Sequence, residues 1–216
     1  MDAVMPNFPL PRLRLAAMAF GLSMLLGCTA EPPAPPPKLL SAEQAAVRTV
    51  VPLTRPIALD KAGQVVDLEF ELPPAGEDEV PVLTLGMRVW GDDAKAALAH
   101  EERITQRDLP TQVHLYAVVP GGAVDVPLTY SQKDQRSEAK VGSDGAVPHT
   151  TAQSAASGLR KAGLLDGKRV YIYRNFAEWR PAVAGKYRLT IKLSEERPEL
   201  AGLAAELVIG YPSRPK

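Results

Sequence analysis

Apolar and polar residues alternate with a period of two along much of the chain, a pattern that predicts half-buried β-strands. In the clearest run, 186–193, every second residue is apolar and the others are Lys, Arg or Thr. Similar alternation predicts strands at 63–72, 83–90, 113–119, 169–174 and 203–211. With weaker extended stretches at 50–59 and 123–130, we expect seven or eight short strands. This pattern predicts an all-β fold, an antiparallel β-sandwich.

Turn and breaker residues refine this strand map. Pro52 and Pro56 restrict the 50–59 stretch to an edge strand, because proline cannot donate to a neighbouring strand. The Pro120-Gly121-Gly122 turn favours a hairpin between 113–119 and 123–130.

Two stretches favour helices at the periphery of the sandwich. Residues 92–108 are rich in Ala, Glu, Lys and Arg and contain neither Gly nor Pro, so we expect a helix opened by Asp92 or Asp93 over one end of the sheet. Residues 39–49 form either a short helix, with Ser41 as N-cap and Gln44 three residues on, or unordered linker.

Residues 131–167 are polar, contain Gly and Ser, and have almost no large apolar residue before Leu159. We expect a long surface excursion with a helix at 151–161. Long loops are either functional or disordered, so this stretch is a candidate contact surface.

The N-terminus has the pattern of a secretory signal. Arg12 and Arg14 precede the uncharged apolar run 15–26, which is too short for a comfortable transmembrane helix. The run ends at Leu25-Leu26-Gly27-Cys28, whose cysteine is the only one in the chain. These residues resemble the lipobox of bacterial lipoproteins. The alternative is an ordinary signal peptide with an incidental cysteine.

The lipobox resemblance implies cleavage between Gly27 and Cys28, with diacylglycerol on the Cys28 thiol and an acyl chain such as palmitate on the new amine. Several acyl chains make membrane attachment nearly permanent. Thr29 stands where Asp favours inner-membrane retention in many lipoproteins. The resemblance therefore implies a lipid-anchored protein of the cell envelope, in the outer membrane and facing the periplasm.

The resemblance and the composition together divide the chain into three parts: a signal peptide at 1–27, the lipidated Cys28 with a Pro-rich tether at 28–38, and a β-sandwich domain at 39–216. The tether contains EPPAPPPK, which favours polyproline II and spans roughly 25 Å. Such a tether would hold the domain away from the membrane surface.

The charge of the chain bears on its binding partners, and its cysteine content bears on disulfide bonds. The whole chain has 25 basic and 25 acidic residues. Removal of 1–27 takes away Asp2, Arg12 and Arg14 and leaves 23 against 24. We therefore expect no nucleic-acid partner, because the basic excess that phosphate binding requires is missing. No cysteine follows Cys28, so no disulfide forms within the domain.

No motif indicates a catalytic, cofactor or metal site. The three histidines, His100, His114 and His149, form neither HExxH nor a pair at helical spacing. The sequence also lacks a Gly-x-Ser-x-Gly elbow, a phosphate-binding P-loop and a dinucleotide fingerprint. Carboxylates such as Asp67 and Glu69 are expected on a solvent-facing side. We therefore expect a protein that is not an enzyme.

One short segment concentrates residue types that anchor interfaces. Tyr and Trp also stack on sugar rings. The segment contains Tyr171, Tyr173, Asn175, Phe176, Trp179 and Arg180. The alternative is structural: the large aromatic rings close one end of the sandwich, and Arg180 and Pro181 shape the following turn.

The C-terminal pattern Gly185-x-Tyr187-x-Leu189-x-Ile191 resembles the penultimate strand of many immunoglobulin-like modules, here followed by a final hairpin through a Pro-Glu-Leu turn. The chain as a whole resembles small proteobacterial lipoproteins of unassigned function. The resemblance implies a non-catalytic protein-binding module, with immunity against a secreted toxin as one role. Two alternatives remain: an assembly subunit of an envelope or secretion complex, and a carbohydrate- or peptidoglycan-binding module.

Overall fold

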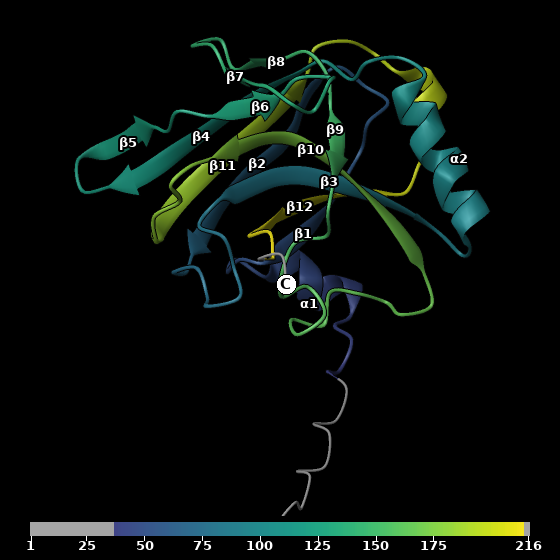
Figure 1. Cartoon of the computed structure of the whole chain (residues 1–216), viewed down its shortest axis with the longest axis horizontal. Helices are drawn as coiled ribbons and strands as arrows, with labels where there is room; N and C mark the ends of the chain where they lie inside the picture. The colour runs from purple at the N-terminus through teal and green to yellow at the C-terminus, as the bar shows by residue number, and fades with distance from the viewer. Residues whose placement is uncertain (1–36, 214–216) are drawn as a thin grey trace, which may run out of the picture. The chain divides into compact units, whose positions relative to one another are not determined.

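Two antiparallel sheets face each other and form a β-sandwich, as the alternating pattern predicts (Figure 1). The computed structural model describes residues 37–213. The larger sheet has the order β1 (Leu53–Ile57), β12 (Ala205–Gly210), β3 (Leu83–Gly91), β10 (Val170–Trp179), β6 (Thr129–Ser131) and β7 (Glu138–Lys140), with β9 (Thr151–Gln153) also paired to β10. The smaller sheet has the order β2 (Gly63–Leu72), β11 (Gly185–Leu193), β4 (Thr111–Val119) and β5 (Gly122–Asp125), with β8 (Ala146–Val147) also paired to β4.

The main core lies between the two sheets and consists of the inward residues of the alternating strands. Leu189 of β11 lies opposite Leu115 of β4, and both are fully buried. The ring of Phe70 on β2 lies 5.9 Å from the ring of Tyr187 on β11. On the other face of this sheet, Arg188 pairs with Asp67 at 2.7 Å, so the charged positions face solvent as expected.

The β3 strand is buried on both faces, although its sequence alternates. Its outward face, which includes Arg88, is covered by a segment that we call the cover segment, residues 154–168, and a short helix, α1 (Ala42–Val47), packs against this segment. The cover segment brings Leu159 and Leu164 onto this face, where they form a second, smaller core with Ala156 and Val208. The sandwich therefore has a partial third layer.

The 131–167 stretch differs from its prediction. It supplies β7, β8 and β9, and Leu159 within it is fully buried. The helix predicted at 151–161 is wrong: residues 151–153 pair with β10 and the rest forms turns. The prediction fails because two buried leucines, 159 and 164, are too sparse to produce a periodic signal, while pairing to an existing strand satisfies the backbone.

The predicted final hairpin is also wrong. The chain passes from β11 in one sheet to β12 in the other through a short 3-10 helix, η1 (Pro198–Leu200). Arg197, before this turn, is completely buried and donates a 2.7 Å hydrogen bond to the Asp108 carbonyl. This buried guanidinium fixes the crossing between the sheets. Likewise, the predicted return strand 123–130 divides into β5 and β6, which belong to different sheets.

The helices predicted within 39–49 and 92–108 both form. Ser41 and Gln44 make a reciprocal capping box at the start of α1, which confirms the helix rather than an unordered linker. The second helix, α2 (Ala94–Thr105), begins after Asp93, whose carboxylate accepts a 2.7 Å bond from the Ala96 amide. Figure 1 shows α2 beside one end of the sandwich, as expected. Neither of these helices is long and apolar enough to cross a membrane.

The described N-terminal residues join the sandwich before the first strand. Leu40 donates a 2.9 Å backbone hydrogen bond to Gly163 in the cover segment. Residues 49–51 then bond to β2, with the Val51 amide 3.0 Å from the Glu71 carbonyl. The predicted edge position of β1 is confirmed. The lipobox with Cys28, the signal peptide and most of the tether lie outside the described residues.

Candidate functional site

The aromatic segment that the sequence singled out lies on β10, where a bulge between Asn175 and Ala177 splits it. Before the bulge, Tyr171 and Tyr173 lie on the outward face of the larger sheet, and their rings are 6.3 Å apart. At the bulge itself, Phe176 is buried in the main core, and beyond it the Trp179 ring lies 5.1 Å from that of Tyr187 on the opposite sheet. The bulge turns the two halves of the segment in opposite directions.

Tyr171 and Tyr173 are half-buried, and Arg88 lies between them and the cover segment. The Arg88 guanidinium lies 4.4 Å from the centre of the Tyr171 ring and donates a 2.8 Å bond to the Leu164 carbonyl in the cover segment. It also pairs with Glu206 at 2.6 Å. Burial raises the pKa of Tyr173, and the nearby Arg88 charge opposes this effect. These tyrosines serve as packing for the cover segment.

Arg180 lies apart from both halves, on the surface beyond the end of β10. It pairs with Glu178 at 2.5 Å and with Glu138 of β7 at 3.2 Å. Its hydrogen bond to Glu178 is the main reason that its pKa is raised. The predicted set of Tyr171, Tyr173, Phe176, Trp179 and Arg180 thus does not form one exposed aromatic platform.

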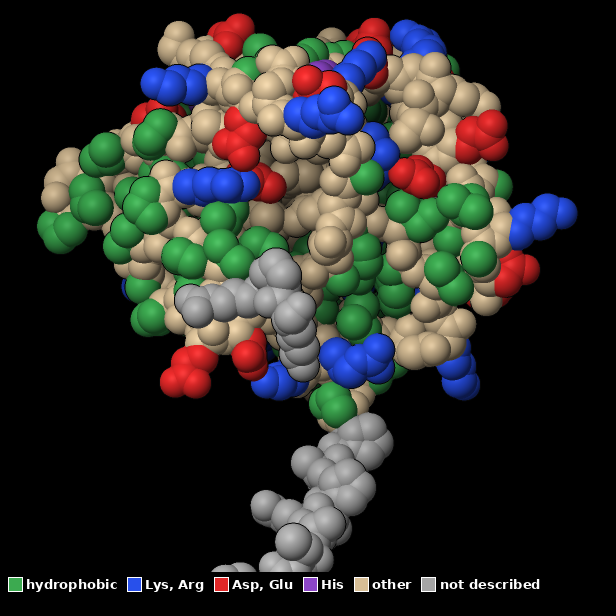
Figure 2. All heavy atoms as spheres, viewed as in Figure 1, with side chains coloured by type: hydrophobic (Ala, Val, Ile, Leu, Met, Phe, Trp, Pro, Cys, Tyr) green, Lys and Arg blue, Asp and Glu red, His purple; other side chains and the backbone are tan. Residues whose placement is uncertain are grey.

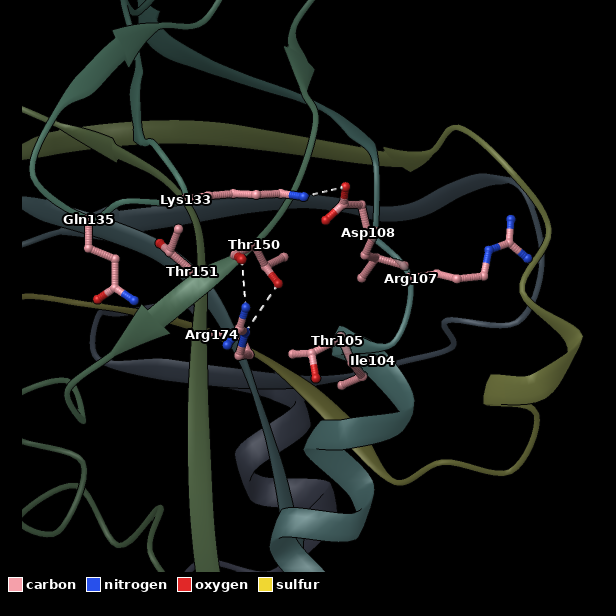
Figure 3. Close-up of a pocket in the computed structure, with 10 residues that line it drawn as sticks. Ile104, Thr105, Arg107, Asp108, Lys133, Gln135, Thr150, Thr151 and Arg174 are labelled. Carbon is pink, nitrogen blue, oxygen red and sulfur yellow. Dashed lines mark hydrogen bonds and ion pairs between the residues drawn. The ribbon is translucent and has the colours of Figure 1, made fainter.

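A polar cleft of about 260 Å³ lies where the C-terminal end of α2 meets the β6–β7 hairpin and the start of β9 (Figure 3). Its lining is drawn from segments far apart in the sequence: Ile104, Thr105, Arg107, Asp108, Leu109, Lys133, Gln135, Thr150, Thr151 and Arg174. In Figure 3, Lys133 reaches across toward Asp108, while Arg107 points away from the other labelled side chains.

Two cations of the cleft differ in how firmly they are held. Arg174 has a side chain that is 13% exposed, and it pairs with Glu101 of α2 at 3.0 Å. It also donates to the Thr150 carbonyl at 2.6 Å and to the Thr150 hydroxyl at 3.2 Å. Lys133 is 66% exposed, and its partner among residues 37–213 is Asp108, at 2.8 Å. Arg174 is therefore fixed, and Lys133 is free to exchange partners.

The sequence contains one indication of this cleft, Arg174, which belongs to no motif. Arg174 follows Val170 and Ile172 at the same two-residue spacing, and Ile172 packs against the main core. A charged residue at an inward strand position needs a buried partner, which is a reason to single it out. No spacing rule connects it to Asp108, Lys133 or Thr150, because only the tertiary fold brings them together.

A third surface feature is the outer end of the β4–β5 hairpin, which projects from the body of the sandwich (Figure 1). Val118, Val119 and Val124 are 40%, 43% and 56% exposed there. Figure 2 shows hydrophobic side chains gathered over this projecting end. The β5 strand is the edge of its sheet, and all four of its residues are exposed.

The histidines lie in three separate environments. His100 contacts the Trp90 carbonyl, His114 stacks on Tyr116, and His149 lies against Tyr130 and the Ser131 carbonyl. Within residues 37–213, no group of three or more His, Cys, Asp or Glu side chains is placed to hold a metal ion.

Comparison with known proteins finds one similar solved structure. No family model matches the chain, and no curated protein matches it. A crystal structure of a protein from Sulfurospirillum deleyianum is similar, with 15% sequence identity and a TM-score of 0.42, over 76% of this chain and 98% of that one.

Proposed function

We propose that this protein is a lipid-anchored envelope protein that binds another protein without catalysis, and that the outer end of the β4–β5 hairpin is its contact surface. The observation that carries this proposal is the coincidence of an open strand edge with three exposed valines. Folded proteins normally protect such edges with charges, proline or a covering segment.

One edge strand of each sheet makes the contrast plain: β1 in the larger sheet and β5 in the smaller sheet. The β1 edge is covered, because Arg55 within β1 donates to the carbonyls of Ala45 in α1 and of Arg48 just after it. The β5 edge, with residues GAVD, has only Asp125 as a charged side chain. An extended segment of a partner can add to β5 through main-chain hydrogen bonds, while Val119 and Val124, which share one face of the hairpin, supply apolar contact.

The proposed anchor gives this surface its setting. Lipidation at Cys28 and the Pro-rich tether would hold the sandwich at the outer membrane, facing the periplasm, where partners approach from the envelope. The glycan-binding alternative has lost its aromatic platform. Immunity and assembly both remain protein-binding roles, and they differ in the stoichiometry of the partner.

The test uses the full chain, expressed in its own envelope and purified in mild detergent after cross-linking. Val124→Lys places a charge at the proposed contact. Val183→Lys is a matched control, since Val183 is similarly exposed, at 58%, but lies on the β10–β11 connection. We expect one or more partners cross-linked to wild type and to Val183→Lys, and lost by at least about tenfold in Val124→Lys.

Equal cross-linking of the two variants would overturn the hairpin as the contact surface. A single stoichiometric partner would support the immunity role, and a set of envelope subunits would support assembly. If no specific partner is cross-linked in any sample, wild type included, the result would count against protein binding. Metabolic labelling with palmitate, compared between wild type and Cys28→Ala, tests the anchor separately, and label that persists in the variant would contradict it.

A further inference from the structure

We propose that the polar cleft between α2, the β6–β7 hairpin and β9 binds a small soluble oxyanion, a phosphate or a short carboxylate, through Lys133 and Arg174. The proposal concerns a different surface from the β4–β5 hairpin and does not depend on partner binding. The observations behind it are the shape of the cleft, its donors and the weakness of its internal ion pair.

The size of the cleft favours a small ligand. At about 260 Å³ it is below the roughly 300–1,000 Å³ of sites that hold drug-sized molecules. Its polar lining includes Thr150, Thr151 and Gln135, which carry two hydroxyls and an amide. Hydroxyl, amide, guanidinium and ammonium groups are the donors that recognise phosphate and carboxylate oxygens.

Arg174 supplies a cation that is already in position. Its largely shielded guanidinium uses three of its five N–H groups, two on Thr150 and one on Glu101. The other two have no hydrogen-bond partner among residues 37–213. Because Thr150 and Glu101 hold the side chain in one orientation, little conformational entropy is lost when a ligand takes up these N–H groups.

Lys133 supplies the exchangeable cation. Its partner Asp108 is 51% exposed, so the pair at 2.8 Å is of the exposed kind that contributes little to stability. In Figure 3 this pair extends over the same space that Arg174 and Thr150 line. Asp108 therefore occupies the place of an external oxyanion, and an oxyanion in the cleft would compete with it for Lys133.

This competition predicts effects of opposite sign from two neighbouring residues. Lys133→Ala removes a ligand contact and should weaken oxyanion binding at least about fivefold. Asp108→Asn removes the internal competitor and its negative charge, and should tighten binding about threefold. Both side chains are largely exposed, so neither variant is expected to unfold the domain.

The experiment titrates the full chain in detergent with sodium phosphate, and separately with succinate, at low ionic strength, and follows the backbone amide resonances of Lys133, Thr150 and Thr151. The control variants carry the same changes of charge elsewhere: Arg136→Ala on the same hairpin, outside the cleft lining, and Asp92→Asn before the other end of α2. Glucose, at the same concentrations, is the uncharged control ligand.

Saturable shifts with phosphate or with succinate, together with the opposite responses of Lys133→Ala and Asp108→Asn, would support the site and identify which oxyanion it prefers. Shifts that rise without saturation, or that change as much in Arg136→Ala as in Lys133→Ala, would overturn it. A titration in which glucose saturates and neither oxyanion does would also overturn it.

Discussion

The two cores of this protein differ in how they are built, although they share the larger sheet. The main core lies between the inward faces of long strands, which pair with their neighbours through many backbone hydrogen bonds. The smaller core has four buried apolar residues, Ala156, Leu159, Leu164 and Val208. The cover segment is held to the strands beneath it by few backbone bonds, including one from Ser157 to the Tyr211 carbonyl.

The difference indicates that the two regions have separate stabilities. A segment that buries little and makes few long-range backbone bonds opens at a lower free energy than the central strands. Its packing is nevertheless close: a Cβ on Gly210 would lie 2.6 Å from the Cβ of Ala156. We therefore expect the cover segment to open as a unit while the sandwich below it stays folded.

The largest effect is expected from Leu189→Ala in the centre of β11. Leu189 is fully buried between both neighbouring strands, where the surroundings cannot collapse onto a cavity. Urea unfolding should show a loss of about 3–4 kcal/mol in the free energy of unfolding. A loss below about 1 kcal/mol would mean that the main core is much looser than its burial indicates.

Leu159→Ala tests the other core with the same chemical change. Leu159 is equally buried, but its segment can open alone, so the cost to global unfolding should not exceed about 2 kcal/mol. Native-state hydrogen exchange should show faster exchange at Ala162 and Leu164, whose amides are bonded within the segment. A loss as large as that of Leu189→Ala, with uniform exchange, would contradict separate stabilities.

The same contrast explains what could be predicted from the sequence. The main core repeats a two-residue period over long strands, so 63–72 and 186–193 were predicted almost to their ends. The capping residues Ser41 and Asp93 likewise act within three residues of their targets. The smaller core depends on Leu159 and Leu164, which contact β12 and α1 across more than 40 residues of sequence, and no local pattern marks such contacts.

The candidate sites follow this rule even more strictly. The aromatic segment was visible as composition, but the bulge at Asn175 decided which rings are exposed, and composition does not encode a bulge. The polar cleft unites residues from 104 to 174 and has no motif. Val118 and Val119 of the β4–β5 hairpin belong to a correctly predicted strand, yet the alternating pattern of that strand does not indicate that β5 lies at the edge of its sheet in the described part of the chain.

A smaller effect is expected from Glu206→Gln, which tests the polar link between the cover segment and the sheet. Arg88 has a side chain that is only 5% exposed, and Glu206 is its single carboxylate partner. Weakening the pair should cost about 1–2 kcal/mol in urea unfolding, because the guanidinium charge stays buried. Asp67→Asn at the exposed Arg188 pair is the matched control and should cost less. Equal losses would indicate that burial of Arg88 has no consequence.

The smallest effect is expected from Tyr211, which contacts both the main core and the cover segment. Its ring lies in the main core, and its carbonyl accepts a hydrogen bond from the Ser157 amide. Its hydroxyl donates to the Pro73 carbonyl at 2.7 Å. Burial, aided by the charges of Glu79 and Tyr187, raises its pKa to about 12. An unfolded tyrosine ionises near pH 10, so above that pH the unfolded chain loses this proton first and gains stability relative to the folded one.

The stability that Tyr211 contributes is therefore complete below pH 10 and declines as the pH rises toward 12. Between pH 9 and 11 the free energy of unfolding should fall by about 1 kcal/mol on this account. Burial also raises the pKa of Tyr173 and Tyr187, so these residues add a decline of the same sign. In urea unfolding of Tyr211→Phe, the free energy of unfolding should fall between pH 9 and 11 by about 1 kcal/mol less than in the wild type. Tyr116→Phe, on the other face of the smaller sheet, is the control. If exchange at Ala162 and Leu164 accelerates over the same pH range, ionisation of Tyr211 releases the cover segment first; if only global unfolding responds, the ring belongs energetically to the main core alone.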